Sequence, residues 1–189
     1  MIILRRLLFV ILLLPVLLVL VSLFLPSRYR VERSLAMKAR PETIFALINT
    51  PRSWPEWTVW TVARFRDMKV SFSGPDAGVG AAYAWEGKSS GNGLLKITSS
   101  DSTNGIAYDL EFERRYFAKG SISLQPSADS VRVTWVNTGE LGWNPVSRFF
   151  GVFFVDKRMG PDLEVGLWNL KRKVEAASGE SLRQPSGSL

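Results

Sequence analysis

Asp109, Glu111 and Glu113 stand at alternate positions of one segment, and their type and spacing resemble a set of acid–base groups. Proton transfer would require such carboxyl groups to face a substrate inside a cavity. Side chains of a strand alternate between its two faces, so the apolar residues at positions 106, 108, 110 and 112 share the opposite face. We therefore predict a solvent-exposed row of carboxylates and no catalytic carboxylate pair in the interior.

The sequence contains no cysteine and no histidine. It therefore lacks disulfides, thiol nucleophiles, the commonest general base and the commonest zinc ligand. Tyr83, Tyr108, Arg64, Asp156 and Arg158 remain as candidates for proton transfer, and nothing in their spacing distinguishes one from another. The segment GVGAAYA lacks the third glycine of a dinucleotide-binding loop. We predict no metal and no cofactor.

The chain carries 24 Lys and Arg residues against 17 Asp and Glu, which gives a net charge of +7. Such a charge would permit binding to nucleic acid or to an anionic membrane surface. The basic residues are scattered singly, however, and no nucleic-acid recognition motif accompanies them. Nucleic acid is therefore not a predicted partner. The hydrophobic fraction of 46% indicates a folded domain with a substantial core.

Residues 7–25 form an uncharged apolar segment that follows Arg5 and Arg6. In a helix this segment would extend about 28 Å, close to the hydrocarbon thickness of a bilayer. We expect an uncleaved transmembrane anchor. A cleaved signal peptide is the alternative, although the apolar run exceeds a signal core of about 7–15 residues and lacks an A-x-A-like cleavage site. The prediction is a single-pass protein of the cell membrane, with the bilayer as a partner and the side of the domain undetermined.

A long amphipathic helix is predicted at residues 156–176, at the end of a domain that covers 27–176. The anchor covers 1–26, and the polar tail at 177–189 is expected to be disordered. Gly166 lies inside the helix, where glycine is unfavourable, so its missing side chain indicates either close approach or empty space. The apolar residues of the helix recur at spacings of one face: Leu163, Leu167, Leu170 and Val174.

Alternating apolar and polar residues predict a strand from Tyr29 to Lys38, although Arg33 interrupts its apolar face. Pro41 begins the first of two short helices, and the proline-containing segment after Thr50 carries three tryptophans. Between Met68 and Leu141, strand patterns alternate with short turn-rich separators, which predicts a meander of six antiparallel strands. The long helix should lie across the apolar face of this sheet.

Four segments in this order resemble the SRPBCC, or START-like, superfamily, and specifically its polyketide cyclase/dehydrase-like branch: YRVERSLAMKARPETIFALINTPRSWPEWTVW, FSGPDAGVGAAYAWEG, IAYDLEFE and LEVGLWNLKRKVEA. The resemblance covers Tyr29 to Ala176. It implies an α+β helix-grip fold, in which a curved antiparallel sheet of about seven strands wraps around the long C-terminal helix and encloses a cavity for an apolar ligand. Many members of this branch also carry an N-terminal membrane-spanning segment.

The aromatic residues of the expected interior could line a pocket, because ligand sites are mostly apolar with a few polar groups. The alternative is that they only fill the core. The apolar stretch NPVSRFFGVFFVD, before the long helix, is either a mobile lid or a packed connection. The predicted ligand-binding residues are Trp57, Trp60, Tyr83, Trp85, Tyr108, Leu110, Phe112, Trp135, Phe153, Leu163 and Leu167.

Three functional hypotheses follow from these residues and from the resemblance. The first is a membrane-tethered, non-catalytic binder or carrier of a hydrophobic small molecule or lipid. The second is an enzyme, a polyketide cyclase or dehydrase that acts on an aromatic or lipid-like substrate. The third is a tethered protein-interaction domain with a filled core. One fold serves all of these functions, so the site itself must distinguish them.

Overall fold

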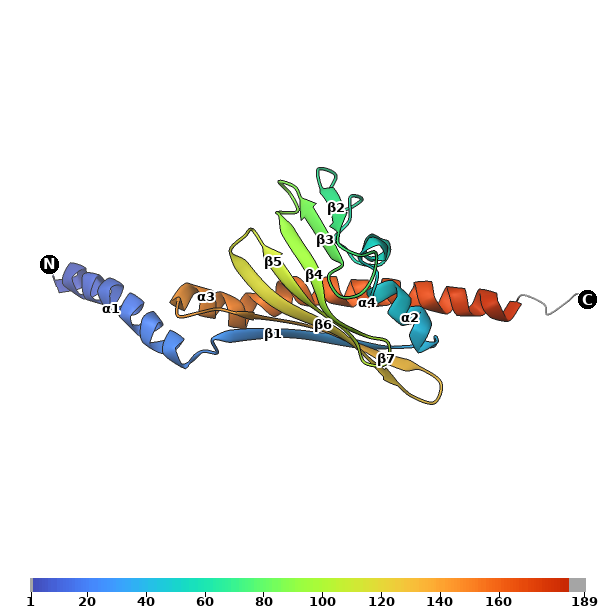
Figure 1. The fold of residues 1–189 in the computed structure, drawn as a ribbon. Coiled ribbons are helices and arrows are strands. Elements are labelled where there is room, and N and C mark those ends of the chain that lie inside the picture. Colours follow the sequence, from blue (N-terminus) through green and yellow to red (C-terminus); the bar gives the residue numbers. More distant parts are fainter. Residues whose placement is uncertain (1, 184–189) are drawn as a thin grey trace, which may run out of the picture.

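The computed structural model describes residues 2–183, with the side chains of Phe9 and of residues 13–178. The chain begins with helix α1 and then forms an antiparallel sheet that is crossed by the long helix α4 (Figure 1). The strands are β1 (Arg28–Met37), β2 (Lys69–Ser73), β3 (Ala82–Glu86), β4 (Gly93–Asp101), β5 (Gly105–Phe112), β6 (Tyr116–Pro126) and β7 (Val131–Glu140). The helices are α1 (Ile2–Phe24), α2 (Pro41–Ile48), the 3₁₀-helix η1 (Pro51–Glu56), α3 (Pro145–Phe150), the π-helix η2 (Gly151–Val155) and α4 (Asp156–Arg183).

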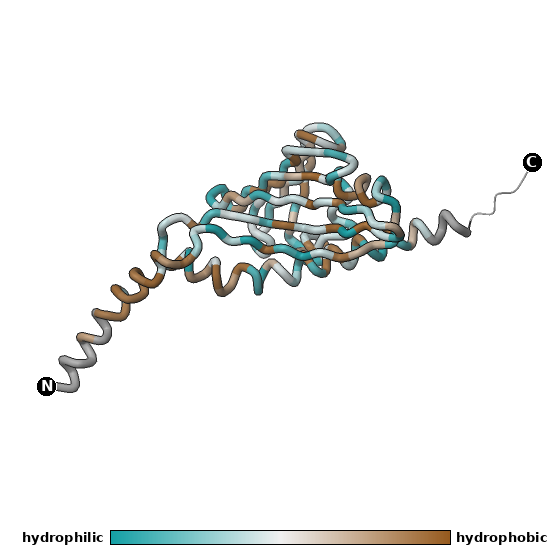
Figure 2. Tube along the Cα trace, turned by 90° about the horizontal axis from the view of Figure 1, so that it is seen from below, coloured by the Kyte–Doolittle hydropathy of each residue, from teal (hydrophilic) through white to brown (hydrophobic). Residues whose placement is uncertain are grey.

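The seven strands lie in the order β1-β7-β6-β5-β4-β3-β2. Strands β2 to β7 therefore form the predicted meander, and β1 closes the sheet by pairing antiparallel with β7 from Arg28 opposite Glu140 to Met37 opposite Val131. This arrangement, with α2 and η1 after β1 and α4 at the end, is the helix-grip fold expected from the sequence. Hydrophobic and hydrophilic residues alternate along the strands (Figure 2).

Helix α4 packs on the sheet through the stripe that the sequence indicates. Leu163, Leu167, Leu170 and Val174 are at most 1% exposed. Helix α2 adds Ile44 to the same core, where its side chain is fully buried. The helix extends to Arg183, beyond the predicted end at Ala176, and residues 184–189 of the predicted tail lie outside the described residues.

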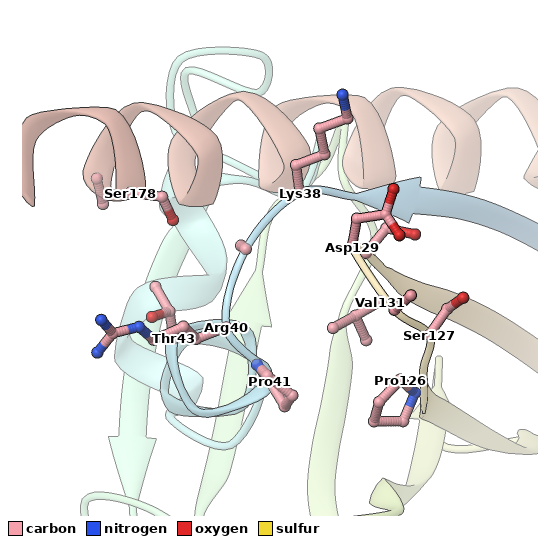
Figure 3. A pocket seen from close by; sticks show the side chains of 13 residues that line it. Lys38, Arg40, Pro41, Thr43, Pro126, Ser127, Asp129, Val131 and Ser178 are labelled. Carbon is pink, nitrogen blue, oxygen red and sulfur yellow. The ribbon is translucent and has the colours of Figure 1, made fainter. Parts of the chain in front are cut away.

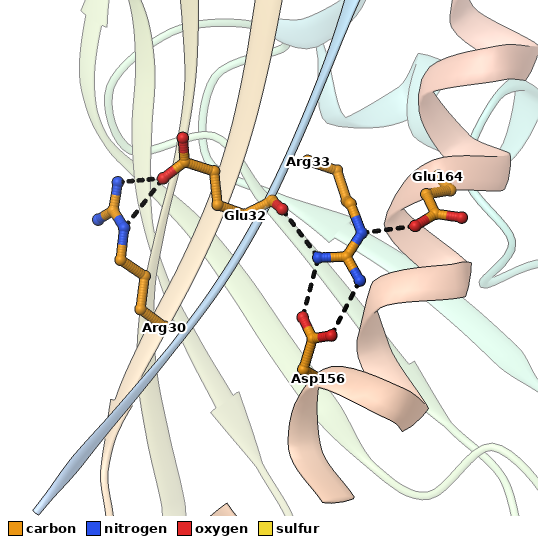
Figure 4. A network of polar contacts seen from close by, with 5 residues as sticks. All are labelled: Arg30, Glu32, Arg33, Asp156 and Glu164. Atoms are coloured by element: carbon orange, nitrogen blue, oxygen red, sulfur yellow. Dashed lines mark hydrogen bonds and ion pairs between the residues drawn. The ribbon is translucent and has the colours of Figure 1, made fainter. Parts of the chain in front are cut away.

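Arg33 joins β1 to the start of α4, which explains why a cation interrupts the apolar face of that strand (Figure 4). Its guanidinium donates two hydrogen bonds to the Asp156 carboxylate, at 2.8 and 3.0 Å, and one to Glu164 at 2.5 Å. It also donates to the Glu32 carbonyl oxygen at 2.8 Å. A Cβ atom at Gly160 would overlap this guanidinium, so the glycine leaves room for the arginine in the position where it makes these hydrogen bonds. The hydrogen bonds from Arg33 hold the pKa of Asp156 below its usual value.

Arg148 attaches the end of α1 to α3. Its side chain is 5% exposed and donates hydrogen bonds to the carbonyl oxygens of Ser22 at 3.0 Å, of Leu23 and Leu25 at 3.4 Å each, and of Gly142 at 2.9 Å. The last carbonyl groups of a helix have no partner within the helix and carry partial negative charge, so a buried cation satisfies them there.

The predicted apolar segment lies in helix α1, but the prediction that it spans a membrane is not supported. Among the residues that the structure describes, none of the helices combines the length and the apolar character needed to cross a bilayer. This finding contradicts the predicted single-pass location in the cell membrane.

We predict that Arg33→Gln lowers the free energy of unfolding by about 1–2 kcal/mol at pH 7, because it removes a bidentate pair and a second carboxylate contact at a partly exposed site. The folded-state pKa of Asp156 is depressed, so this stabilisation is complete above the unfolded pKa of about 3.9 and is lost as the pH falls through the folded pKa. Urea unfolding at several pH values measures the difference between the two proteins.

Arg30→Gln is the matched control for this substitution, since Arg30 pairs with Glu32 on the same strand but both side chains are largely exposed. Its effect should stay below about 0.5 kcal/mol. If Arg33→Gln lowers the free energy of unfolding by the same amount below the folded pKa of Asp156 as at pH 7, Arg33 stabilises the fold through packing and not through its ion pair.

Candidate ligand-binding site

Aromatic rings from η1, the following loop and β7 meet beneath α4. The ring centroids of Trp57 lie 5.1 Å from Trp54 and 5.2 Å from Trp135. Trp54 also meets Tyr108 edge-on at 5.5 Å. Trp57 is fully buried and Trp135 is 1% exposed, so these rings form the centre of the core.

The aromatic contacts continue from this centre toward the other edge of the sheet. The ring centroids of Trp60 and Trp135 lie 6.4 Å apart. The carbonyl oxygen of Trp60 accepts a hydrogen bond of 3.0 Å from the Tyr83 hydroxyl. The ring centroid of Tyr83 lies 5.5 Å from that of Trp85 and 5.5 Å from that of Phe72. We call this set the aromatic row; it comprises Trp54, Trp57, Trp60, Phe72, Tyr83, Trp85 and Trp135.

Gly166 allows α4 to approach the aromatic row. A Cβ atom at this position would lie 2.7 Å from the edge of the Trp135 ring, closer than real Cβ contacts allow. Of the two interpretations of this glycine, the structure therefore supports close approach rather than empty space. The cost of a glycine in a helix is offset by packing against a large ring.

One polar network is complete within the core. Trp135 donates from Nε1 to the Tyr108 hydroxyl at 2.8 Å, and that hydroxyl donates to Oδ1 of Asn137 at 2.8 Å. Burial raises the pKa of Tyr108 far above its usual value, and burial raises the pKa of Tyr83 to about 12. Both hydroxyl groups are therefore protonated at neutral pH, so neither can act as a general base.

Two indole N–H groups in the core lack a partner. Nε1 of Trp57 and Nε1 of Trp85 are buried with no hydrogen-bond acceptor in the described part of the chain. Trp54 shows the usual situation, since its Nε1 donates to the Ile48 carbonyl oxygen at 2.9 Å. Buried donors are nearly always paired in native proteins, so these two require an explanation.

The three carboxylates at positions 109, 111 and 113 lie away from this core, as predicted. Asp109 and Glu113 are exposed and Glu111 is half-buried on the outer side of the sheet. Glu113 accepts a hydrogen bond from the backbone N–H of Asn92 at 2.7 Å, which gives it a role in joining two loops. Within the described residues, no group of three or more potential metal ligands comes together.

The structure brings most of the predicted ligand-binding residues together and leaves two outside. Phe112 is 38% exposed at the end of β5, and Phe153 is 50% exposed in η2, where it stacks on Phe149 at 6.2 Å. Trp60 and Leu110 are half-buried. The remaining predicted residues are buried: Trp57, Tyr83, Trp85, Tyr108, Trp135, Leu163 and Leu167.

Sequence reasoning did not select Trp54, Phe72 or Asn137 as site residues. Trp54 stands three residues before Trp57, and this spacing is the signal that could have identified it. Phe72 alternates with polar residues along β2, which is typical of an aromatic residue on the inner face of a sheet. Asn137 gave no such signal, because an asparagine in a strand is read as a polar surface residue until its partner Tyr108 is known.

A surface cleft of about 490 Å³ (Figure 3) lies beside α2, at the end of the domain away from α1 in Figure 1. Its walls come from the turn before α2, from the β6–β7 hairpin and from α4, and they include Lys38, Arg40, Asp129 and Ser178. None of the predicted ligand-binding residues lines it. The lining mixes charged and short polar side chains with apolar ones such as Pro41, Pro126 and Val131.

A curved antiparallel sheet that encloses a long helix, with an aromatic core between them, defines a helix-grip protein. Residues 28–175 match the family described as polyketide cyclase/dehydrase and lipid transport, and the chain belongs to this family. This membership supports a role in hydrophobic ligand binding or in cyclase-like chemistry. The comparison with curated proteins gives no match.

Solved structures share the fold at low sequence identity. Thalictrum norcoclaurine synthase is 14% identical with a TM-score of 0.61, over 80% of this chain and 96% of that chain. A Rhodobacter sphaeroides protein is 14% identical with a TM-score of 0.58, over 79% and 93%. A Chromobacterium violaceum protein is 17% identical with a TM-score of 0.54, over 79% and 99%. At these identities the likeness shows the fold alone.

We predict that Gly166→Ala lowers the free energy of unfolding by about 1–3 kcal/mol, because the new methyl group overlaps the Trp135 ring. The better helix propensity of alanine, worth about 1 kcal/mol, acts in the opposite direction. Urea unfolding measures the net change. Val165→Ala, at an exposed neighbouring position, should change stability by no more than about 0.5 kcal/mol. A more stable Gly166→Ala variant would show that α4 can move away from the ring.

Proposed function

We propose that this protein binds or carries a hydrophobic small molecule or lipid between the sheet and α4, and that it does not catalyse a reaction on it. The observation that carries this proposal is the aromatic row, a continuous set of mostly buried rings that begins beneath α4 and extends toward the β2 edge of the sheet. A site that is mostly aromatic with few polar groups suits an apolar ligand. Membership in a family described by lipid transport supports the same function.

The polar groups of the core favour binding over catalysis. A cyclase or dehydrase would need a group that gives or takes a proton beside the substrate. In the described part of the core the titratable groups are the buried Tyr83 and Tyr108 and the half-buried Tyr29, all with raised pKa values. The Tyr108 hydroxyl is already engaged at both of its hydrogen-bonding functions by Trp135 and Asn137. The Tyr83 hydroxyl already donates its hydrogen bond to the Trp60 carbonyl oxygen, so an enzymatic alternative would have to break this bond before Tyr83 could act as a proton donor.

The rings contact one another in the described conformation, so a ligand must separate them or displace a neighbouring segment. The segment from α3 through η2 borders the start of α4 and presents the exposed side chains of Phe150, Phe153 and Phe154. Phe150 stacks on Phe154 with ring centroids 5.7 Å apart, and Phe149 and Phe153 form a second stacked pair. Irregular helical segments of the π type occur frequently at functional sites. These features support access for an apolar ligand along this segment.

We predict that the protein binds the neutral fluorescent probe N-phenyl-1-naphthylamine saturably at micromolar concentration. Leu167→Trp should abolish most of this binding, because Leu167 is 1% exposed on the face of α4 that meets the core and the larger ring fills the ligand space. If the core can rearrange for a ligand, it also accommodates the new ring at a cost below about 1–3 kcal/mol. Fluorescence titration and urea unfolding measure the two quantities.

Val165→Trp is the matched control, since it adds the same ring to an exposed position of the same helix. It should retain full probe binding, which also corrects for probe adsorbed on exposed apolar side chains. A parent protein without saturable binding, together with strong destabilisation by Leu167→Trp, would support the filled-core alternative. Mass spectrometry of an organic extract of the purified protein would identify the natural ligand.

A further inference from the structure

The two unpaired indole N–H groups lie at separate points of the aromatic row. Trp57 lies beside α4, where Nδ2 of Asn169 donates to the Trp57 carbonyl oxygen at 3.2 Å. Trp85 lies on β3, and its ring covers Gly93 of the neighbouring strand so closely that a Cβ there would overlap it. Trp60 and Tyr83 connect these two points through the contacts described above.

These donors differ from the other polar groups of the core in a way that packing does not explain. The indole groups of Trp54 and Trp135 donate to protein acceptors, and so do the hydroxyl groups of Tyr83 and Tyr108. Trp57 is fully buried and Trp85 is 6% exposed, so bulk water does not satisfy either N–H readily. A phenylalanine would fill an apolar core without this unsatisfied donor.

We propose that Trp57 and Trp85 donate hydrogen bonds to acceptor oxygens of the bound ligand, and that this ligand is an uncharged apolar molecule bearing a carbonyl group. The inference rests on the proposed binding function and names the class of ligand. Two donors without protein acceptors match the lone pairs of carbonyl oxygens. A pure hydrocarbon would leave both N–H groups unpaired.

The charge of the ligand follows from what surrounds the row. A buried carboxylate requires a cationic partner, because an unpaired charge in the core is very unfavourable. Among the described side chains, the buried cation is Arg148, and its hydrogen bonds go to Gly142 and to carbonyl groups at the end of α1. Arg33 is committed to Asp156 and Glu164. A neutral ketone or ester therefore fits this interior better than a fatty-acid carboxylate.

The test compares two fluorescent ligands of the same shape. The first is 6-propionyl-2-(dimethylamino)naphthalene, a ketone whose emission shifts to longer wavelength when its carbonyl accepts a hydrogen bond. The second is 6-propyl-2-(dimethylamino)naphthalene, which lacks the carbonyl oxygen. We expect the parent protein to bind the ketone roughly tenfold more tightly, as one satisfied hydrogen bond in a buried site would give.

The ketone probe has one carbonyl oxygen and the two donors lie at separate points, so the probe pairs with one of them. The phenylalanine substitution that removes this donor should reduce the preference, and the double variant Trp57→Phe/Trp85→Phe should bind the two probes within about twofold of each other, with loss of the emission shift. Trp168→Phe is the matched control, because Trp168 is 54% exposed on α4 and lies outside the aromatic row. It should keep the preference of the parent. Replacement of Trp57 or Trp85 by benzothienylalanine, which keeps the bicyclic shape without the N–H, gives the same test if a phenylalanine variant fails to fold.

The outcomes separate this inference from the function on which it rests. Binding of neither probe by the parent protein would overturn the proposed function and the inference with it. Equal binding of ketone and hydrocarbon by the parent would overturn the inference and leave the binding function intact. The inference would also be overturned, with the binding function intact, if the phenylalanine variants at positions 57 and 85 melt at higher temperature than the parent but keep its preference for the ketone. The two N–H groups would then be unsatisfied both with and without a ligand. Tighter binding of the 6-carboxy analogue would overturn the assignment of a neutral ligand.

Discussion

The distance between α4 and the sheet is the constraint on which the rest of this structure depends. Gly166 sets this distance, because only a residue without a side chain allows the helix backbone to approach the Trp135 ring as closely as it does. The leucines on either side, Leu163 and Leu167, can then reach the core and become fully buried. A helix held farther away would leave a gap beside the rings, whereas a side chain at position 166 would displace Trp135 and break its hydrogen bond to Tyr108.

The segment between the sheet and α4 is fixed at both of its ends by buried or partly buried arginines. Arg148, within α3, satisfies carbonyl groups at the end of α1, and Arg33 holds Asp156, the residue that directly follows η2. Phe150, Phe153 and Phe154 between these two points are exposed, Phe149 is half-buried, and the four rings stack in two pairs. The ends of the segment are therefore held by charge-assisted hydrogen bonds, and Gly151 and Val155 of η2 pack inward, so the partly exposed phenylalanine rings are the part of the segment that can move without disturbing α4 or the sheet.

The sequence predicts the fold well because its strongest signals are local. The stripe of Leu163, Leu167, Leu170 and Val174 has the period of a helix, and the strands alternate with the period of a sheet. The role of Arg33 could not be predicted in this way, since its partners Asp156 and Glu164 stand 123 and 131 positions further along the chain. Periodicity indicated that Arg33 interrupts an apolar face, but only the contact with α4 explains why the interruption is tolerated.

The same limit applies to the candidate site, and it determines what kind of chemistry can be inferred. Strand alternation correctly predicts that Tyr83, Trp85 and Tyr108 lie in the interior. It cannot predict whether the polar atom of an interior aromatic residue has a hydrogen-bond partner. The difference lies in contacts across the sheet: the Tyr108 hydroxyl meets Trp135 and Asn137, while Nε1 of Trp85 meets no acceptor among the described residues. A core of paired groups would need no ligand to be complete. The two unpaired donors distinguish this core from a merely filled one, and they do so through hydrogen bonding rather than through ring size or hydrophobicity.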